Sequence, residues 1–383
     1  RLPDRADRAL GLLTGASAEE ERYRAAVAGA ERFLNAWHGT PGVRERLESL
    51  SQAVEDGERA DRYGKGERLD RLERRVADLL GKEAAVFMPS GTMAQQIAMR
   101  IWSDHRGSRT IAFHPTCHLE LHEEKGYERL HGLRATLVGD PNRLVTLADL
   151  QGLREPVAAL LLELPQRELG GLLPEWDDLV AQAGWAREHD VALHLDGARL
   201  WEAQPYYARP HAELAGLFDS VYVSFYKGLG GMAGALLAGD EDLVAEARIW
   251  QRRHGGTLVT MVPYVIAAER ALEERLGRMT AYLEHARALA AALATLDGLE
   301  VVPDPPQTPL FHVHLEGTHD VLADAALSVA EERKVFLFAD PSSTSSPRRQ
   351  RHEVMVGEVT LALSPDEVRD LYAEILARAS ARS

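Results

Sequence analysis

Cysteine is nearly absent from this chain, because Cys117 is the only one in 383 residues. A single cysteine excludes an intrachain disulfide, which suits a reducing compartment, so we expect a cytoplasmic protein. The sequence also shows no signal peptide and no apolar run long enough to cross a bilayer. We therefore expect no membrane partner.

Basic residues are also under-represented, with 44 Lys and Arg against 59 Asp and Glu and a net charge of −15. This balance argues against nucleic acid as a partner. The one basic run, residues 347–352, is interpreted as a solvated loop. The remaining composition, 45% hydrophobic and 27% charged, is typical of a globular protein.

Apolar periodicity and helix breakers predict the organisation of the chain. We expect an N-terminal helical segment over residues 1–55, a large domain over 56–275 and a small C-terminal α/β domain over 276–383. In the terminal regions we expect helices at 5–13, 17–37 and 43–55, a long helix at 262–293 and a strand at 354–363.

The stretch with the clearest chemical pattern is Asp219-Ser-Val-Tyr-Val-Ser-Phe-Tyr-Lys-Gly-Leu-Gly-Gly231, an apolar strand that ends at Lys227. Burial lowers the pKa of a lysine and makes its amine nucleophilic, as a Schiff-base lysine requires. The glycines after it permit a tight turn and a bulky neighbour. The alternative is a lysine that only ends a strand.

A second apolar strand, from Val191, ends in Asp196 and Arg199. Ligands of open α/β sheets bind at the carboxyl ends of the strands, where Asp196 and Lys227 would both lie. An aspartate facing a pyridinium nitrogen and a lysine facing an aldehyde form the protein frame of pyridoxal 5'-phosphate (PLP). The guanidinium of Arg199 suits a substrate carboxylate.

A third stretch offers a phosphate site. A short strand from Ala84 is followed by Ser90, Gly91 and Thr92 and then by a helical pattern. The start of a helix presents free N–H groups and a positive dipole end, and the two hydroxyls add donors. Ser-Gly-Thr also caps helices that bind nothing. In combination with Asp196 and Lys227, we interpret these three residues as cofactor ligands.

These pieces resemble the threonine aldolase and β-eliminating lyase family of fold-type I PLP-dependent enzymes, although the match is that of a divergent member. The resemblance is close over residues 60–260. It implies an α/β fold with a large domain built on a mainly parallel sheet and a small C-terminal α/β domain. The matching motifs are Arg68-Leu-Asp-Arg-Leu-Glu73, Pro89-Ser-Gly-Thr-Met93, His118 with Glu123, His194-Leu-Asp-Gly-Ala-Arg199 and Lys227-Gly-Leu-Gly230.

The resemblance implies further roles. His118 matches a histidine that stacks on the pyridine ring, with an exposed helix histidine as the alternative. Glu123 matches a glutamate near the cofactor that could steer a water or a proton. Gln166 stands where the family has a histidine that contacts the substrate hydroxyl; a glutamine can hydrogen-bond that hydroxyl but cannot act as a base.

Two residues match family positions at the mouth of the site. Tyr63 resembles a tyrosine there, with a turn residue as the alternative. Arg252 matches a cation that reaches the neighbouring subunit's phosphate, with a helix-terminal cation as the alternative. The chain departs from the family at Val259 and Val356, where cations are expected, so Arg199 is the single clear carboxylate clamp.

The predicted function is that of a PLP-dependent lyase, an enzyme of amino acid metabolism. Retro-aldol cleavage of a β-hydroxy-α-amino acid would give glycine and an aldehyde. Lys227, His118, Glu123 and Gln166 are the expected catalytic residues, Arg199, Tyr63 and Gln166 would hold the substrate, and no metal is expected. Alternatives are β-elimination, transaldol exchange or racemisation of another amino acid, and a non-enzymatic PLP-fold protein. An NAD site is disfavoured because no Gly-x-Gly-x-x-Gly follows a first strand. The resemblance implies a homodimer or homotetramer with shared active sites.

Overall fold

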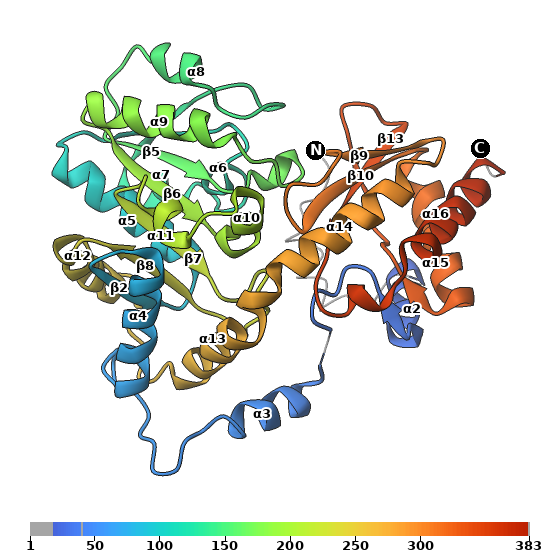
Figure 1. Ribbon diagram of the computed structural model, residues 1–383, viewed down its shortest axis with the longest axis horizontal. Helices are drawn as coiled ribbons and strands as arrows, with labels where there is room; N and C mark the ends of the chain where they lie inside the picture. The colour runs from blue at the N-terminus through green and yellow to red at the C-terminus, as the bar shows by residue number, and fades with distance from the viewer. Residues whose placement is uncertain (1–17, 40, 382–383) are drawn as a thin grey trace. The chain divides into compact units, whose positions relative to one another are not determined.

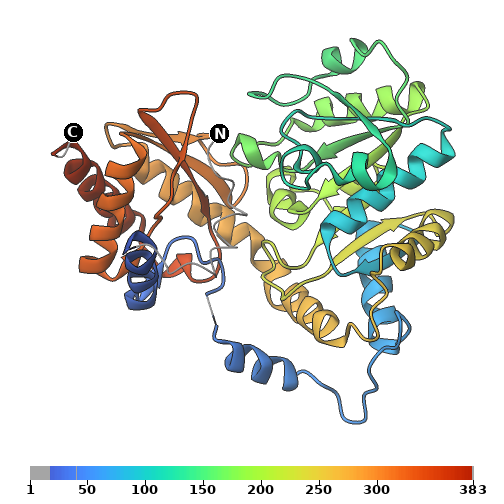
Figure 2. The same cartoon turned by 180° about the vertical axis from the view of Figure 1, so that it is seen from behind.

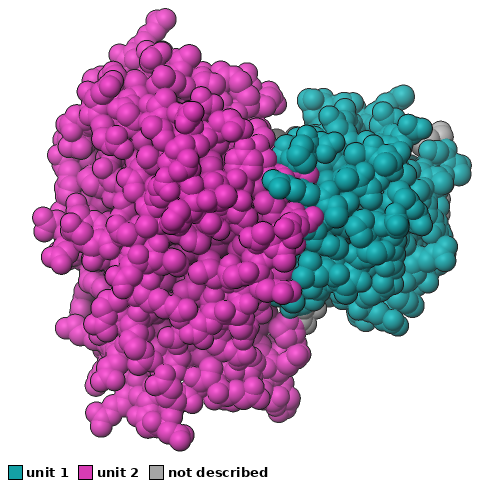
Figure 3. Space-filling view, viewed as in Figure 1, with its two compact units in different colours: residues 1–39, 285–305, 311–383 teal, residues 40–284, 306–310 magenta. Residues whose placement is uncertain are grey.

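The computed structural model describes residues 18–39 and 41–381. These residues form two compact units (Figure 3). Unit 1 takes residues 18–39, 285–305 and 311–381, and unit 2 takes residues 41–284 and 306–310. Each unit combines helices with its own sheet, so both the large and the small α/β parts are present. Residues 18–39 group with unit 1, whereas the sequence predicted a separate N-terminal segment over residues 1–55. The predicted division into three domains stays a prediction.

Unit 2 is built on a seven-stranded sheet (Figure 1) with the order β2-β8-β7-β6-β5-β3-β4. Only β8 is antiparallel to its neighbours, and the pairs from β7 to β4 are all parallel. The expected mainly parallel sheet is therefore confirmed. The strands are β2 (Ala84–Met88), β3 (Thr110–Phe113), β4 (Arg134–Leu137), β5 (Ala159–Glu163), β6 (Ala192–Gly197), β7 (Ser220–Ser224) and β8 (Ala235–Gly239).

Helices lie on both faces of this sheet, with α9 in front of it in Figure 1 and α5 in front of it in Figure 2. Burial on both faces explains why β6 and β7 are fully buried and why their sequences are mostly apolar. The helices of unit 2 are α3 (Val43–Ser51), α4 (Glu67–Leu80), α5 (Gly91–His105), α6 (His118–Leu121), α7 (Gly126–His131), α8 (Leu147–Gln151), η2 (Arg167–Leu169), α9 (Trp176–Glu188), α10 (Leu200–Tyr207), α11 (His211–Ala215), α12 (Glu241–Arg253), α13 (Val262–Arg275) and η3 (Leu276–Arg278).

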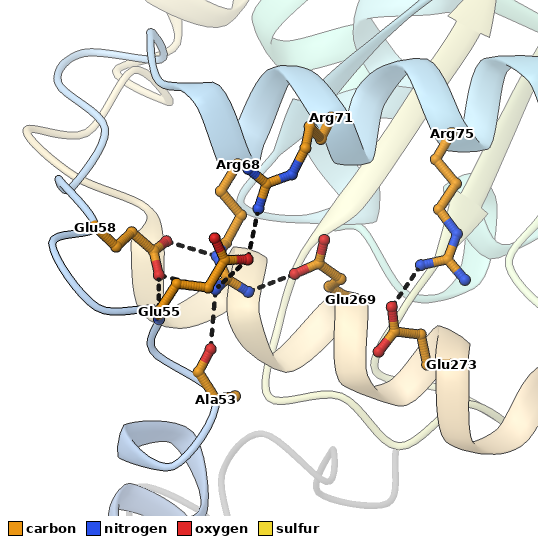
Figure 4. A network of polar contacts seen from close by, with 8 residues as sticks. All are labelled: Ala53, Glu55, Glu58, Arg68, Arg71, Arg75, Glu269 and Glu273. Atoms are coloured by element: carbon orange, nitrogen blue, oxygen red, sulfur yellow. Dashed lines mark hydrogen bonds and ion pairs between the residues drawn. The ribbon is translucent and has the colours of Figure 1, made fainter.

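The segment before α4 is held by one buried arginine (Figure 4). Arg68 donates to Glu58 at 2.5 Å and to the Ala53 carbonyl at 2.9 Å, and it also pairs with Glu269 of α13. Its side chain is 7% exposed, whereas that of its neighbour Arg71 is 44% exposed. Because its guanidinium joins α4, α13 and the 53–58 segment, Arg68 holds these three parts of unit 2 together.

Unit 1 carries a four-stranded sheet with the order β12-β13-β10-β9 and a separate parallel pair, β1 with β11. That pair joins residues 32–33 to residues 335–336, so the segment 18–39 packs with the C-terminal part of the chain. The elements are α2 (Ala18–Gly29), β1 (Arg32–Phe33), β9 (Leu299–Val302), β10 (Leu310–Glu316), α15 (His319–Arg333), β11 (Val335–Phe336), β12 (Ser342–Ser343), β13 (Arg349–Met355), η4 (Thr360–Ala362) and α16 (Pro365–Ser380).

Several helices and strands predicted in the terminal regions have other bounds in the structure. The strand expected at 354–363 is β13 at 349–355, because Gly357 packs against the Trp37 backbone and its N–H donates to Thr360 where η4 begins. The basic run 347–352 therefore lies partly in a strand. The helix expected at 17–37 ends at Gly29, and the helix expected at 43–55 ends at Ser51. The helix expected at 262–293 is interrupted by η3 between α13 and α14 (Met279–Leu293). The helix expected at 5–13 lies outside the described residues.

Candidate active site

A pocket with about 410 Å³ of empty space, partly open to solvent, lies where β5, β6 and β7 end in unit 2. Four of the residues expected at the site line it together: Lys227, Asp196, Arg199 and His118. They come from three separate stretches of the chain. Their meeting at the carboxyl edge of the parallel strands is where an α/β sheet places a ligand.

Lys227 stands in a loop whose backbone is closely fixed. The Gly231 N–H donates to the Phe225 carbonyl at 2.7 Å and the Gly230 N–H to the Lys227 carbonyl at 2.8 Å. Gly230 has a φ of +69°, which favours glycine. A side chain at Gly228 would collide with the Glu202 carboxylate. The glycines therefore allow the turn that holds Lys227, and its Nζ lies 5.5 Å from the centre of the Tyr226 ring.

Asp196 lies near the carboxyl end of β6 and is 5% exposed. One carboxylate oxygen accepts from the Ala198 N–H at 3.0 Å, and the other accepts from the Gln95 amide of α5. Burial raises the pKa of Asp196, while the Ala198 N–H and the nearby His118 and Lys227 lower it. A buried carboxylate needs such partners to stay ionised.

His118 begins α6, and its ring reaches the buried Glu123. The distance from His118 Nδ1 to Glu123 Oε1 is 3.0 Å, and the Gln96 amide donates to the other Glu123 oxygen at 2.9 Å. The Glu123 side chain is 1% exposed, whereas that of His118 is 34% exposed. Glu123 therefore orients the imidazole, and His118 presents it to the pocket.

Arg199 is deeply buried, with a side chain that is 5% exposed. Its Nη1 lies 3.2 Å from a carboxylate oxygen of Glu202, one turn further along in α10. This pair keeps the guanidinium in place at the pocket wall. Arg199 is the guanidinium that the sequence predicted there.

The predicted phosphate ligands lie at the start of α5. Ser90 is its N-cap, and the Ser90 hydroxyl accepts from the Met93 N–H at 3.3 Å. A side chain at Gly91 would overlap the Tyr222 hydroxyl, and Thr92 is exposed. The helix start is thus formed as expected, although a cap alone does not require a ligand.

Seven predicted residues do not line the pocket with Lys227: Glu123, the three phosphate ligands at the start of α5, Gln166, Tyr63 and Arg252. Gln166 is buried, donates to Thr116 at 3.1 Å and lines a neighbouring cavity. Tyr63 is 50% exposed with a φ of +51°, and its N–H donates to Val259. Arg252 is exposed in the last turn of α12. Within this chain, Gln166, Tyr63 and Arg252 do not meet the catalytic group.

The sequence model of the beta-eliminating lyase family matches residues 38–316. The chain belongs to the beta-eliminating lyase family. It is thus identified as an enzyme of the lyase class, and the pocket described above lies inside the matched region.

Individual proteins extend this assignment. An Arabidopsis thaliana protein named low-specificity L-threonine aldolase 1 is 29% identical over 71% of this chain and 79% of its own. A Listeria monocytogenes structure, proposed to be an L-allo-threonine aldolase, is 38% identical with a TM-score of 0.89, covering 94% of this chain and 100% of its own. An Exiguobacterium structure, proposed to be an aromatic amino acid beta-eliminating lyase or threonine aldolase, is 41% identical with a TM-score of 0.88, covering 93% of this chain and 99% of its own.

These likenesses confirm the fold-type I architecture, and enzymes of this family and fold are in general PLP-dependent. The residues of the pocket fit that cofactor: a lysine at the strand end, a buried carboxylate supplied with donors, and an imidazole on the wall. Lys227, Asp196 and His118 would hold it, with the start of α5 as a phosphate site.

Sequence reasoning missed two acids of this lyase pocket, Glu163 and Glu168. Glu163 ends β5, lines the pocket and accepts from the His118 N–H at 2.7 Å. Burial and the neighbouring Asp196 raise the pKa of Glu163 well above its usual range. Its position directly after an apolar strand was the same signal that identified Asp196.

Two general features complete the description. Within 18–39 and 41–381, three or more His, Cys, Asp or Glu side chains nowhere gather in a way that could hold a metal ion. No helix in the described part of the chain has the length and apolar character needed to cross a membrane.

Proposed function

We propose that this chain is a PLP-dependent carbon–carbon lyase that cleaves a β-hydroxy-α-amino acid to glycine and an aldehyde. The observation that carries the proposal is the single pocket lined by Lys227, Asp196, Arg199 and His118. The relatives named as threonine aldolases support the same reaction class. The proposed substrate is an amino acid, which is a small molecule.

Bound PLP would supply an electron sink for breaking the bond between Cα and Cβ. Lys227 would provide the amine that holds the cofactor until the substrate amine replaces it. Asp196 would serve as the ionised acceptor for the pyridine nitrogen and would keep that nitrogen protonated. Arg199 holds the substrate carboxylate, and its own pair with Glu202 keeps it oriented.

His118 is the proposed base for the β-hydroxyl proton, because its ring lines the pocket and is oriented by Glu123. Removing that proton breaks the Cα–Cβ bond, releases the aldehyde, and leaves Cα to take up a proton as glycine forms. Gln166 is proposed to act through Thr116, which lines the pocket and to which it donates at 3.1 Å.

The assembly proposed is a homodimer or homotetramer in the cytoplasm, with sites shared between subunits. Tyr63 and Arg252 are the residues proposed to reach a neighbouring subunit, and both are exposed in this chain. The light scattering of the purified protein gives its mass in solution. A monomeric mass would contradict this assembly.

A second candidate is β-elimination of a β-substituted amino acid. It is favoured by Gln166, which stands where a histidine would serve aldol cleavage and which lines a neighbouring cavity. The two reactions differ in product, because elimination yields a keto acid and ammonia.

The test is product analysis with PLP added. Purified protein is incubated with threonine, allo-threonine and phenylserine, and aldehyde and glycine are measured, with Lys227→Ala as the control. Equal amounts of aldehyde and glycine from the wild type alone are expected. Pyruvate and ammonia from a β-substituted amino acid, without any aldehyde, would contradict aldol cleavage and favour elimination.

A further inference from the structure

A side-chain amide on α5 donates a hydrogen bond to Asp196. Gln95 is 1% exposed, and its Nε2 donates to Asp196 Oδ2. Its Oε1 lies 2.7 Å from His194 Nε2. His194 lies on β6, two residues before Asp196. Residues two apart on a strand share a face, so one helix side chain contacts both.

The contacts continue away from the pocket. His194 Nδ1 lies 2.7 Å from the Ser220 hydroxyl, and the Trp102 indole N–H donates to the same hydroxyl at 2.8 Å. His194 and Ser220 are fully buried and are paired positions of β6 and β7. Trp102 lies two turns after Gln95 in α5, so this one helix supplies both Gln95 and Trp102 to the series of hydrogen bonds.

The direction of these hydrogen bonds follows from which groups can donate. Burial lowers the pKa of His194 to about 3, so its ring is neutral and carries one N–H. The Trp102 indole can only donate, so Ser220 accepts from it and donates to His194 Nδ1. His194 Nε2–H then donates to the Gln95 carbonyl, and the Gln95 NH2 points to Asp196.

The opposite direction requires a different charge on Asp196. With the proton of His194 on Nδ1, the Gln95 amide would turn over and present its carbonyl to the carboxyl of Asp196. Two acceptors would then face each other unless Asp196 were protonated. Ser220 would then accept from both Trp102 and His194, and its own hydroxyl proton would have no acceptor among the described residues. The arrangement from Trp102 to Asp196 satisfies every group and favours an ionised Asp196, because both of its oxygens accept from N–H donors.

We infer that Gln95 is a positioning residue for the cofactor site, and that the chain Trp102–Ser220–His194–Gln95 keeps Asp196 ionised and aimed at the pyridine nitrogen. This inference rests on the proposed function. It explains how a carboxylate that is 5% exposed can stay charged before the cofactor arrives.

The test uses the cofactor-free protein and PLP itself. Three quantities are measured for each variant: the PLP dissociation constant, the pH at which the visible spectrum of bound PLP changes, and the melting temperature. Gln95→Met keeps the side-chain length and removes both amide groups. We expect PLP affinity to fall roughly 10- to 100-fold, and the spectral transition to move up by roughly 1 to 2 pH units.

Two further variants make the result independent of folding. Gln95→Leu removes both amide groups with a different apolar shape, so it should weaken PLP in the same direction. Ser220→Ala removes the donor to His194 and leaves Gln95 in place, and it should shift the spectral transition the same way. The control is Gln182→Met, which removes a buried amide of α9 that donates to the Val145 carbonyl. It should lower the melting temperature without changing PLP affinity or the transition.

The outcomes are distinct. Wild-type PLP affinity and an unchanged transition in both Gln95 variants would overturn the inference while leaving the proposed function intact. An effect of the Gln95 variants without one in Ser220→Ala would overturn the longer chain and keep the role of Gln95. A wild-type protein that binds no PLP would overturn the proposed function and the inference together.

Discussion

Glu163 and Asp196 occupy paired positions on the neighbouring parallel strands β5 and β6. Both carboxyl groups line the same pocket, and burial raises the pKa of each. When two carboxyls share one site, ionisation of one raises the pKa of the other. Since Asp196 receives N–H donors from Ala198 and Gln95, Glu163 is the acid that holds a proton.

This relationship predicts a pH-dependent stability. In the unfolded chain Glu163 ionises near its ordinary pKa of 4.5, whereas in the folded cofactor-free protein it stays protonated to a higher pH. Its stabilising contribution is complete below the unfolded pKa and is lost as the pH rises through the folded pKa. We expect Glu163→Gln to gain in melting temperature relative to the wild type as the pH is raised from 4.5. A constant difference at every pH would contradict the protonated state.

The proposed base predicts a loss of turnover with retained cofactor. His118→Phe keeps an aromatic ring but cannot carry a proton, so kcat should fall by roughly 100-fold. PLP affinity should change little, because the ring still packs. His122→Phe is the matched control, since His122 lines the same pocket with its ring 5.1 Å from that of His118 and contacts Glu168 in place of Glu123. Equal losses in the two variants would show that His118 is not the base.

Alanine substitution should have opposite effects on stability at two helix glycines, Gly91 at the start of α5 and Gly184 in α9. A methyl group at Gly91 would overlap Tyr222, so Gly91→Ala should lower the free energy of unfolding by about 1–3 kcal/mol and weaken PLP. Gly184 lies inside α9 with open space around it, so Gly184→Ala should stabilise the protein by about 0.5–1 kcal/mol. Denaturant unfolding measures both. A neutral Gly91→Ala would show that the turn can shift.

The buried arginine network predicts a stability difference between neighbours on α4 (Figure 4). Arg68→Met leaves Glu58 and Glu269, whose side chains are 12% and 15% exposed, without their cation, so the free energy of unfolding should fall by about 1.5–3 kcal/mol. Arg71→Met removes only an exposed pair with Glu55 and should cost less than about 1 kcal/mol. Similar losses from the two substitutions, measured by urea unfolding, would contradict the assigned role of Arg68.

The parts of the fold that the sequence predicted are those with strong local signals. β6 and β7 are apolar runs buried on both faces, and each is followed by the polar residues that line the pocket. Parallel strands bring their carboxyl ends to one edge, so Asp196 and Lys227 could be placed together without coordinates.

The features of the structure that the sequence did not predict depend on tertiary contacts. The polar alternation of β13 resembles a solvated loop until its partner strand is known, and Gly357 ends the strand through a contact with Trp37 far away in sequence. Gln95 reads as an ordinary helix residue, because only the crossing of α5 over β6 brings it to Asp196. Gln166 was expected beside the substrate, yet its amide turns to Thr116.

The most direct test of the central claim is the site at which PLP attaches to the protein. The wild-type protein is incubated with PLP, the covalent bond is reduced with borohydride, and the labelled peptide is identified by mass spectrometry. The account predicts one label, on Lys227, and none in Lys227→Ala, with aldehyde release lost in the same variant. A label on another lysine, or undiminished aldehyde release from Lys227→Ala, would contradict it.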